Sequence, residues 1–256
     1  MTRIYLNASE LAGITGHNQW KDSNEIGEQI LIRNKLKKGE LIRNDIQKKL
    51  SSIHDEELLD ALKKELKLPK TTTKNELEKH IKKTYITPLL KTKKEKDSHT
   101  QQKNMMTNTP LTQKIFSQAA HSDLIKKRGN VKEEQALNRS EAKNNVKITS
   151  RNSKMYTKVL YEDDNYTILL RGKVDGIEND DTIVESKNRS KRLFMKIPEY
   201  EKVQLEAYMF LTGLTTARHI ENYNETSNEI MYTHNNEFWE MCKNTIIEFV
   251  LTLVDN

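Results

Sequence analysis

The sequence predicts an α/β fold in which a mixed, mostly antiparallel central sheet is flanked by helices. Apolar residues recur at helical spacing near the amino terminus, again from Leu111, and at the carboxy terminus. Between these regions, residues 147–187 contain β-branched and aromatic runs that are separated by turn residues. A chain of 256 residues can bury one core of ordinary size and carry a small additional module.

Charge and cysteine content narrow the class of protein. The net charge of +6 would suit a polyanionic partner, although charge alone does not determine chemistry. Cys242 is the only cysteine, which excludes an intrachain disulfide and a cysteine zinc cluster and favours a reducing compartment. No run of about 18 apolar residues occurs, and the first residues lack the apolar core of a signal peptide. We therefore expect a soluble intracellular protein that does not enter a membrane.

The first elements are a short strand and a short helix within residues 4–16, with Asn7 or Ser9 near the helix cap. A hydroxyl and free amides at a helix start can hold a phosphate, whereas an ordinary N-cap explains the same residues without any ligand. A longer helix is expected over residues 23–38 because Ile26, Ile30 and other apolar residues recur at helical spacing.

Residues 39–110 are rich in lysine and poor in apolar residues. Two helices are expected at residues 56–66 and 74–83, and the second begins with the capping box T-K-N-E at Thr73. The pair resembles the SAP-type helix-extension-helix DNA-binding motif, and a plain charged helical hairpin explains it equally well. Residues 91–110 have the polarity and low complexity of a flexible linker. The chain thus divides into a main domain of residues 1–38 and 111–256, a helical insert of residues 39–90 and this linker.

A helix that begins at Leu111 is expected to end at the basic residues 126–129, and a second helix is expected from Asn130. Glu133 lies in the first turns of that second helix, where the helix dipole favours acidic side chains. The following segments, residues 147–150, 155–161 and 166–173, are expected to be strands, with a turn at residues 162–165.

Three charged residues mark the centre of the chain. In the strand that follows residues 178–181, side chains alternate, so Glu185 and Lys187 project from the same face. A hairpin would bring the carboxylate of Asp175 beside that of Glu185. Two such carboxylates can bind Mg²⁺ or Mn²⁺ and leave several water molecules on the cation. The alternative is a surface hairpin with a cross-strand salt bridge, worth about 0–1 kcal/mol.

A helix that begins near Pro198 follows this strand. Gln204 and Tyr208 lie one turn apart beside its apolar stripe, and an amide and a phenol in this place can fix the lysine or contact a phosphate. Two more strands are expected at residues 217–223 and 229–234. The carboxy-terminal helix then buries a stripe that includes Cys242, which we interpret as core or an oligomer face.

The order of these motifs, D-G at Asp175, E-x-K at Glu185 and Q-x-x-x-Y at Gln204, resembles the PD-(D/E)XK nuclease superfamily. It is most similar to the branch that contains lambda exonuclease, the YqaJ-like viral recombinases and the RecB nuclease domains. Residues 7–21 are similar to the amino-terminal serine motif of this branch, and residues 129–133 are similar to its G-x-x-x-E helix. The resemblance implies a restriction-endonuclease-like core interrupted by the helical insert.

The resemblance also implies roles for individual residues. Asp175 and Glu185 would hold a catalytic Mg²⁺ or Mn²⁺ together with the carbonyl of Ser186. Glu133 would be a further ligand or would position water, and Lys187 would be the catalytic lysine.

Among the remaining residues, Gln204 would orient the site and Tyr208 would support it. Ser9 would contact the terminal 5′ phosphate of DNA. Thr2 stands where exonucleases of this branch carry an arginine, and Arg3 is one residue out of register. The basic side chains of Arg189, Lys191 and Arg192 would track phosphates, unless they belong to a solvated loop.

These assignments imply a Mg²⁺-dependent deoxyribonuclease, expected to be a 5′–3′ exonuclease that acts on duplex DNA ends in recombination or repair. A structure-selective or nicking endonuclease of the same fold is one alternative, and a non-catalytic DNA-binding protein is another. A single-strand annealing or recombination partner protein and a homo-oligomer remain open. The composition, rich in lysine and asparagine, suits an AT-rich genome such as that of a large DNA virus or phage, in which case the protein would act in the host cytoplasm or nucleus.

Overall fold

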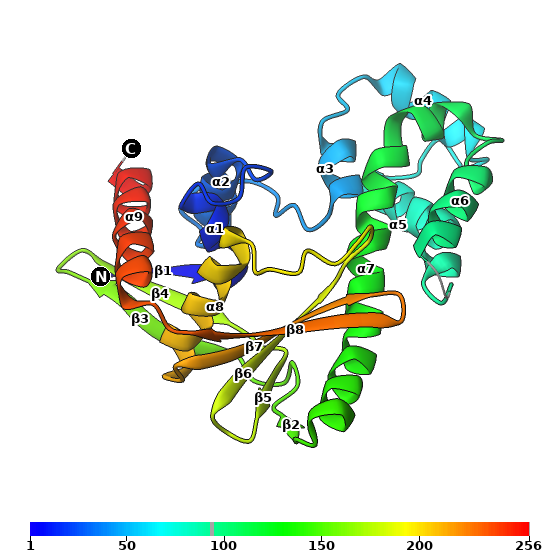
Figure 1. The fold of residues 1–256 in the computed structure, drawn as a ribbon. Helices are drawn as coiled ribbons and strands as arrows, with labels where there is room; N and C mark the ends of the chain where they lie inside the picture. Colours follow the sequence, from blue (N-terminus) through cyan, green and yellow to red (C-terminus); the bar gives the residue numbers. More distant parts are fainter. Residues whose placement is uncertain (93–94, 256) are drawn as a thin grey trace.

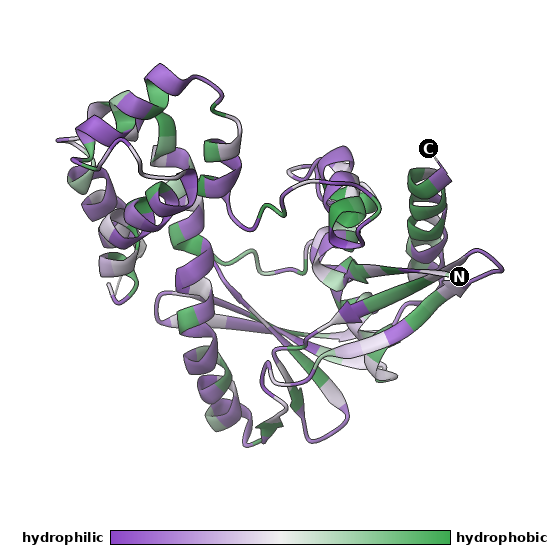
Figure 2. Ribbon diagram, turned by 180° about the vertical axis from the view of Figure 1, so that it is seen from behind, coloured by the Kyte–Doolittle hydropathy of each residue, from purple (hydrophilic) through white to green (hydrophobic). Residues whose placement is uncertain are grey.

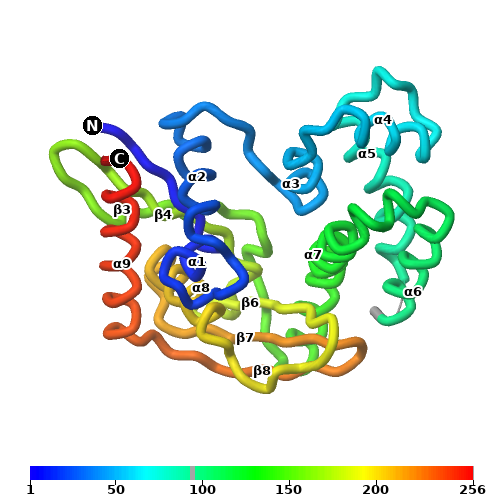
Figure 3. The backbone as a smooth tube through the Cα atoms, turned by 90° about the horizontal axis from the view of Figure 1, so that it is seen from above, coloured from blue at the N-terminus to red at the C-terminus, as the bar shows by residue number. Residues whose placement is uncertain are grey.

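A computed structural model of the chain describes residues 1–92 and 95–255. They form two lobes that are joined by the long helix α7 (Pro110–Asn144) (Figure 1). The core lobe contains both β-sheets, and the helical lobe contains residues 45–124. Seen from above, the two lobes lie on opposite sides of the carboxy-terminal half of α7 (Figure 3). None of the helices in these residues is long and apolar enough to cross a membrane.

The strands form two mixed sheets in which most neighbours are antiparallel, as the sequence predicts. The first sheet has the order β1-β4-β3, with β1 (Thr2–Asn7) parallel to β4 (Tyr166–Gly172) and β3 (Tyr156–Glu162) antiparallel to it. The second sheet has the order β2-β5-β6-β7-β8, and only β6 and β7 are parallel. Its strands are β2 (Ile148–Thr149), β5 (Gly176–Glu178), β6 (Thr182–Asn188), β7 (Thr216–Tyr223) and β8 (Thr226–Thr233).

The β5–β6 hairpin fixes the register of the central charged residues. Its turn contains Asn179 and Asp180, whose φ angles of 48° and 67° lie in the left-handed region that asparagine and aspartate tolerate. Gly176 pairs with Val184, so the residue before Gly176 lies opposite the residue after Val184. Asp175 and Glu185 are therefore cross-strand neighbours, as predicted.

Helices cover the sheets and close the main apolar core. These elements are η1 (Ala8–Glu10), α1 (Leu11–Ile14), α2 (Ser23–Arg33), α8 (Glu199–Thr212) and α9 (Asn236–Asp255). The hydrophobic turns of α9 stand out in Figure 2, and Cys242 is buried in its stripe as expected. Helix α2 ends five residues before the expected end because the Asn34 side chain folds back to accept the Tyr5 N–H at 2.9 Å.

The helical lobe has an apolar core of its own. It contains α3 (Asp45–Ser51), α4 (Glu56–Glu65), α5 (Lys74–Tyr85), η2 (Thr87–Leu89) and α6 (Glu95–Met105). The capping box at Thr73 is present as predicted. Phe116, Ala120 and Leu124 of α7 pack into this core. The boundary between insert and main domain therefore lies within α7 and not at residue 111, because one helix contributes to both cores.

The expectation of a flexible linker over residues 91–110 is wrong for residues 95–105, which form α6. The buried amide of Gln102 donates hydrogen bonds to the carbonyls of Tyr85 and Ala120 at 3.0 and 3.1 Å. Met106 is buried directly after this helix. Polar contacts with distant residues order the segment, and its composition could not reveal them. Residues 93 and 94 of the expected linker lie outside the described residues.

Helix α7 does not break at residues 126–129, which corrects the prediction of two helices. Arg128 is fully buried and donates to the carbonyls of Leu89 at 2.7 Å and Thr92 at 2.6 Å. Asn188 of β6 donates to the carbonyl of Gly129 at 2.9 Å. The basic segment thus has partners from both lobes. The helix continues to Asn144, and Leu137 in its second half packs against the second sheet. Glu133 consequently lies in a helix interior.

We predict that Gly129→Ala stabilises the protein by about 0.5–1 kcal/mol, because alanine costs less conformational entropy than glycine within a helix. A Cβ atom at this position would have no neighbour within 4 Å. Chemical denaturation measures the change. The control is Gly213→Ala at the end of α8, where φ is +80° and the same substitution should destabilise. Destabilisation by both variants would contradict a continuous α7.

Candidate active site

An open cleft of about 770 Å³ lies where α7, the β5–β6 hairpin and α8 meet. It is lined by every residue that the sequence predicts to bind metal or to act in catalysis, namely Glu133, Asp175, Glu185, Ser186, Lys187, Gln204 and Tyr208. These residues come from segments up to 75 positions apart, and α7, the β5–β6 hairpin and α8 bring them together.

Strand β6 supplies the acid and the lysine on one face, as expected. The Lys187 ammonium donates to Glu185 Oε1 at 2.5 Å and to Gln204 Oε1 at 3.0 Å. Burial alone would lower the pKa of Lys187, but the negative charges of Glu185 and Glu201 outweigh it and raise this pKa above its usual value. The other oxygen of Glu185, Oε2, is buried and has no hydrogen-bond partner among the described residues.

Asp175 precedes β5 and is buried. Its Oδ2 atom accepts a hydrogen bond from the Ser186 N–H at 2.8 Å, which ties the two hairpin strands together beyond their last paired residues. Burial, together with the negative charges of Glu185 and Glu133, raises the pKa of Asp175 well above its usual range. The carboxylates therefore repel one another in the absence of a cation.

Glu133 reaches the cleft from α7 and is half-buried. Its carboxylate accepts a hydrogen bond from the side-chain amide of Asn152. Burial and the charge of Glu185 raise the pKa of Glu133. Sequence reasoning did not identify Asn152, because it lies in the loop between β2 and β3, with a φ of 45°, and no local pattern links it to α7.

Two residues of α8 continue the contacts of the lysine. The Gln204 amide nitrogen donates to the Tyr208 hydroxyl at 2.7 Å, and its oxygen faces Lys187. Tyr208 is 5% exposed, and burial followed by the charge of Glu185 raises its pKa well above the usual value. Gly172 leaves room for this ring, since a Cβ atom there would lie 2.9 Å from it. The phenol, the amide and the ammonium thus form one chain of contacts that ends at Glu185.

Ser9 is exposed in η1, and its carbonyl accepts a hydrogen bond from the Lys21 ammonium at 2.7 Å. Burial lowers the pKa of Lys21, and the positive charges of Lys126 and Lys187 contribute to the same shift. Lys21 therefore lies close enough to the cleft to sense the charge of Lys187. The sequence pattern includes Lys21 at the end of the serine motif, but its contact with Ser9 depends on the fold of the intervening turn.

Arg189 lines the cleft, where its expected contact with phosphates stays a prediction. Its guanidinium forms ion pairs with Glu201 at 2.6 Å and Glu221 at 2.5 Å, lies over the Phe194 ring, and leaves the side chain 9% exposed. These contacts use its donors to hold α8 against β7. Lys191 and Arg192 are exposed in the loop between β6 and α8, where a phosphate contact stays a prediction.

The donor set fits a hard divalent cation that keeps part of its water shell. Glu185 Oε2 is a buried acceptor without a donor, and Asp175 lies opposite it on the neighbouring strand. Such carboxylate oxygens are the ligands that Mg²⁺ and Mn²⁺ prefer. No three His, Cys, Asp or Glu side chains in the described ranges form a metal-binding group. Waters or substrate oxygens would therefore complete the coordination of a cation held by Asp175 and Glu185.

Comparisons with known proteins give structural matches only. No protein-family model and no curated protein matches the chain. The chain is similar to a crystal structure of the alkaline exonuclease LHK-Exo from Laribacter hongkongensis, with 13% identity and a TM-score of 0.42 over 50% of this chain and 68% of that chain. It is also similar to a phage-related exonuclease from Haemophilus somnus 129PT, with 13% identity and a TM-score of 0.41 over 51% and 71% of the two chains. A third match, SSO0001, has 14% identity and a TM-score of 0.37 over 54% and 68%.

We predict that Asp175→Asn raises the melting temperature of the cation-free protein by a few degrees, because it removes one of several like charges while its amide oxygen can still accept from Ser186. Adding Mg²⁺ or Mn²⁺ should raise the melting temperature of the unmodified protein and should leave that of the variant almost unchanged. Asp180→Asn in the exposed turn is the matched control and should respond to the cations normally. An equal response of all three proteins would exclude a cation at Asp175.

The ion pairs of Glu201 predict that the folded protein loses stability in acid. Burial would raise the pKa of Glu201, but hydrogen bonds from His219 and Arg189 outweigh it and lower this pKa to about 2. Because this pKa is lower in the folded state than in the unfolded state, the stabilisation is complete above about pH 4.5 and is lost as the pH falls toward 2. It amounts to at most about 3 kcal/mol.

In denaturation experiments at a series of pH values, Glu201→Gln should therefore be less stable at pH 7 and lose less stability between pH 5 and about pH 3. Glu199→Gln, an exposed neighbour on α8 whose side chain is 58% accessible, should follow the unmodified protein. A profile for Glu201→Gln that runs parallel to that of the unmodified protein would show that this carboxylate does not control acid unfolding.

Proposed function

We propose that the chain is a Mg²⁺- or Mn²⁺-dependent deoxyribonuclease of the PD-(D/E)XK superfamily. The proposal rests on the contacts of Glu185. One of its oxygens accepts from the Lys187 ammonium, which also contacts Gln204, and the other oxygen has no hydrogen-bond partner among the described residues and lies on the strand opposite Asp175. A surface salt bridge would not need a buried acceptor without a donor, nor a second buried carboxylate whose pKa is raised by its neighbours.

Each residue of the cleft is assigned one role in the hydrolysis of a phosphodiester. Asp175 and Glu185 would hold the cation, which supplies a water of lowered pKa and neutralises charge on the phosphate. Lys187 would direct its ammonium at the attacking water or at the charge that develops on phosphate oxygens. Gln204 and Tyr208 would fix the orientation of Lys187, and Glu133 would bind the cation shell through water.

The exonuclease form of this activity, directed from a 5′ end of duplex DNA, is supported by Ser9 and Lys21. The Lys21 ammonium places a cation directly beside Ser9, although the arginine expected from the resemblance is replaced by Thr2. A hydroxyl and an ammonium near a helix start can together hold a terminal phosphate. We place such an enzyme inside the cell, in recombination or repair, where it would work with single-strand annealing proteins.

An endonuclease with the same chemistry is favoured by one feature. Ser9 and Arg3 are both exposed, and Thr2 stands where the resemblance places an arginine. A phosphate grip that depends on Lys21 alone would be weaker than a bidentate arginine contact.

We expect Lys187→Ala to lower the rate of DNA hydrolysis by about 10²–10⁴-fold, because it removes a positive charge next to the reacting phosphate. The assay incubates linear and covalently closed duplexes with Mg²⁺ or Mn²⁺ and, separately, with a chelator. Loss of linear DNA alone identifies an exonuclease, and cutting of closed circles identifies an endonuclease. Lys243→Ala on α9, which does not line the cleft, is the control. Absence of cleavage with either cation would overturn the proposed function.

A further inference from the structure

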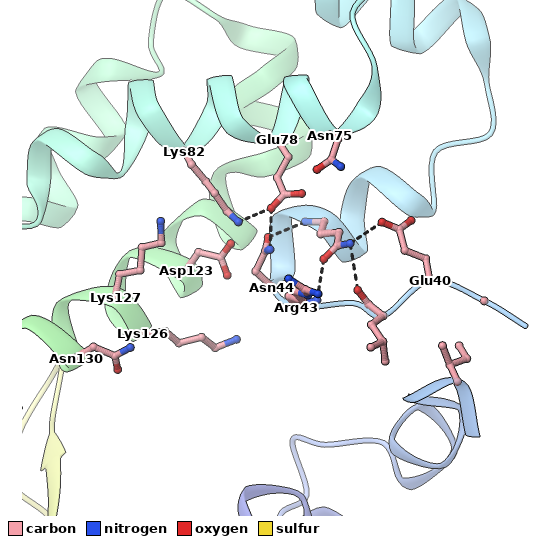
Figure 4. A pocket seen from close by; sticks show the side chains of 14 residues that line it. Glu40, Arg43, Asn44, Asn75, Glu78, Lys82, Asp123, Lys126, Lys127 and Asn130 are labelled. Carbon is pink, nitrogen blue, oxygen red and sulfur yellow. Dashed lines mark hydrogen bonds and ion pairs between the residues drawn. The ribbon is translucent and has the colours of Figure 1, made fainter. Parts of the chain in front are cut away.

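A second large cavity, of about 890 Å³, is lined by residues 32–47, by α5 and by the middle of α7. Helix α7 supplies one wall, helix α5 the facing wall, and residues 39–44 before α3 the third side (Figure 4). The cavity is polar, and its charged or amide side chains from α7 are Asp123, Lys126, Lys127 and Asn130. The helical insert therefore does more than pack on the core lobe, because it encloses a polar space with it.

This interlobe cavity is continuous with the catalytic cleft. Lys126 and Asn130 line both spaces. On α7, Lys126 precedes Glu133 by seven residues, which corresponds to about 10 Å along a helix axis. A chain molecule bound in the catalytic cleft could thus extend past Lys126 into the interlobe cavity without leaving the surface of α7.

Three acidic side chains line the cavity, and Glu40 among them accepts a hydrogen bond from the Gln47 amide at 2.8 Å. Glu78 pairs with Lys82 and accepts from the Asn44 amide at 2.8 Å. Asp123 is buried and accepts from the backbone N–H groups of Asp45 and Ile46, at the start of α3. The negative charges of Glu78 and Asp123 are therefore balanced by protein groups, so these two carboxylates repel an anionic ligand less than free carboxylates would.

Two cations of the cavity form no ion pair of their own among the described residues. Burial would raise the pKa of Glu78, but hydrogen bonds from Lys82 and Asn44 and the charges of Lys82 and Lys127 lower it, so Lys127 lies near that carboxylate without pairing with it. Within the part of the chain that the structure describes, the Arg43 guanidinium and the Lys127 ammonium form neither an ion pair nor a hydrogen bond. Arg43 is exposed on the segment before α3, and Lys127 is half-buried on α7. Lys126 adds a third cation whose partner, Asp45, holds it at the surface with the lysine side chain 62% accessible. The positive charge thus lines the route from the catalytic cleft outward.

We infer that the interlobe cavity binds the phosphodiester backbone of a single nucleic-acid strand that continues from the catalytic cleft. The inference rests on the proposed function and names where its substrate strand runs. A volume of about 890 Å³ suits a few nucleotides of one strand, and a positively charged groove is the usual device for holding a strand independently of sequence. The amides of Asn75 and Asn130 supply neutral donors along the same route.

The test measures the binding of a short fluorescein-labelled DNA single strand in chelator, where no hydrolysis occurs, over a series of salt concentrations. Arg43→Glu and Lys127→Glu should each weaken binding about 5- to 10-fold, and the milder Lys127→Gln should weaken it about 3-fold. Each lost contact should also lower the slope of log Kd against log salt by about 0.7. Lys114→Glu, an exposed lysine on α7 outside the cavity, makes the same charge change and should bind as the unmodified protein does.

The outcomes separate this inference from the proposed function. If the unmodified protein cuts DNA and the Arg43 and Lys127 variants bind as it does, the strand path is wrong and the nuclease stands. Selective loss of binding in a protein that never cuts would leave the strand path standing and overturn the nuclease. Equal weakening by Lys114→Glu, or no binding by the unmodified protein, overturns the strand path, and thermal melting of each variant excludes unfolding as the cause.

Discussion

The contact between the Lys187 ammonium and the Glu185 carboxylate is the interaction on which the candidate site depends. It sets an attractive pair among carboxylates that otherwise repel one another, since burial and the charge of Glu185 raise the pKa values of Asp175 and Glu133. Strand β6 fixes both partners on one face, and Gln204 holds the ammonium from α8. The second oxygen of Glu185 has no hydrogen-bond partner among the residues that the structure describes, which is the arrangement expected of a site that binds a cation.

Helix α7 connects the candidate site to the cores of both lobes. It carries Glu133 into the catalytic cleft, packs Leu137 on the second sheet, and places Phe116 and Leu124 in the core of the helical lobe. Because the same helix belongs to both cores, the position of the insert relative to the cleft is tied to the position of Glu133. The buried guanidinium of Arg128, bonded to carbonyls before α6, makes this connection specific.

Some charged residues near the site form ion pairs within the protein, and others line a cavity. The net charge of the chain does not distinguish the two kinds. Arg189 holds α8 and β7 together through ion pairs with Glu201 and Glu221. Arg43 and Lys127 face a polar cavity and have no such partners in the described part of the chain. The distinction follows from burial, because a largely buried arginine requires acidic partners, whereas water can solvate an exposed cation at a cavity wall.

The sequence by itself determined the elements and the short-range geometry. Period-two alternation set Glu185 and Lys187 on one face, the turn at Asn179 set Asp175 opposite, and helical spacing set Gln204 above Tyr208. These relations depend only on backbone periodicity and local turns. Tertiary structure alone decided that Asn152 bonds to Glu133, that Arg189 pairs with Glu201 and Glu221, and that α6 and the middle of α7 are helical. Those outcomes rest on hydrogen bonds and ion pairs between residues far apart in the chain, which no local pattern encodes.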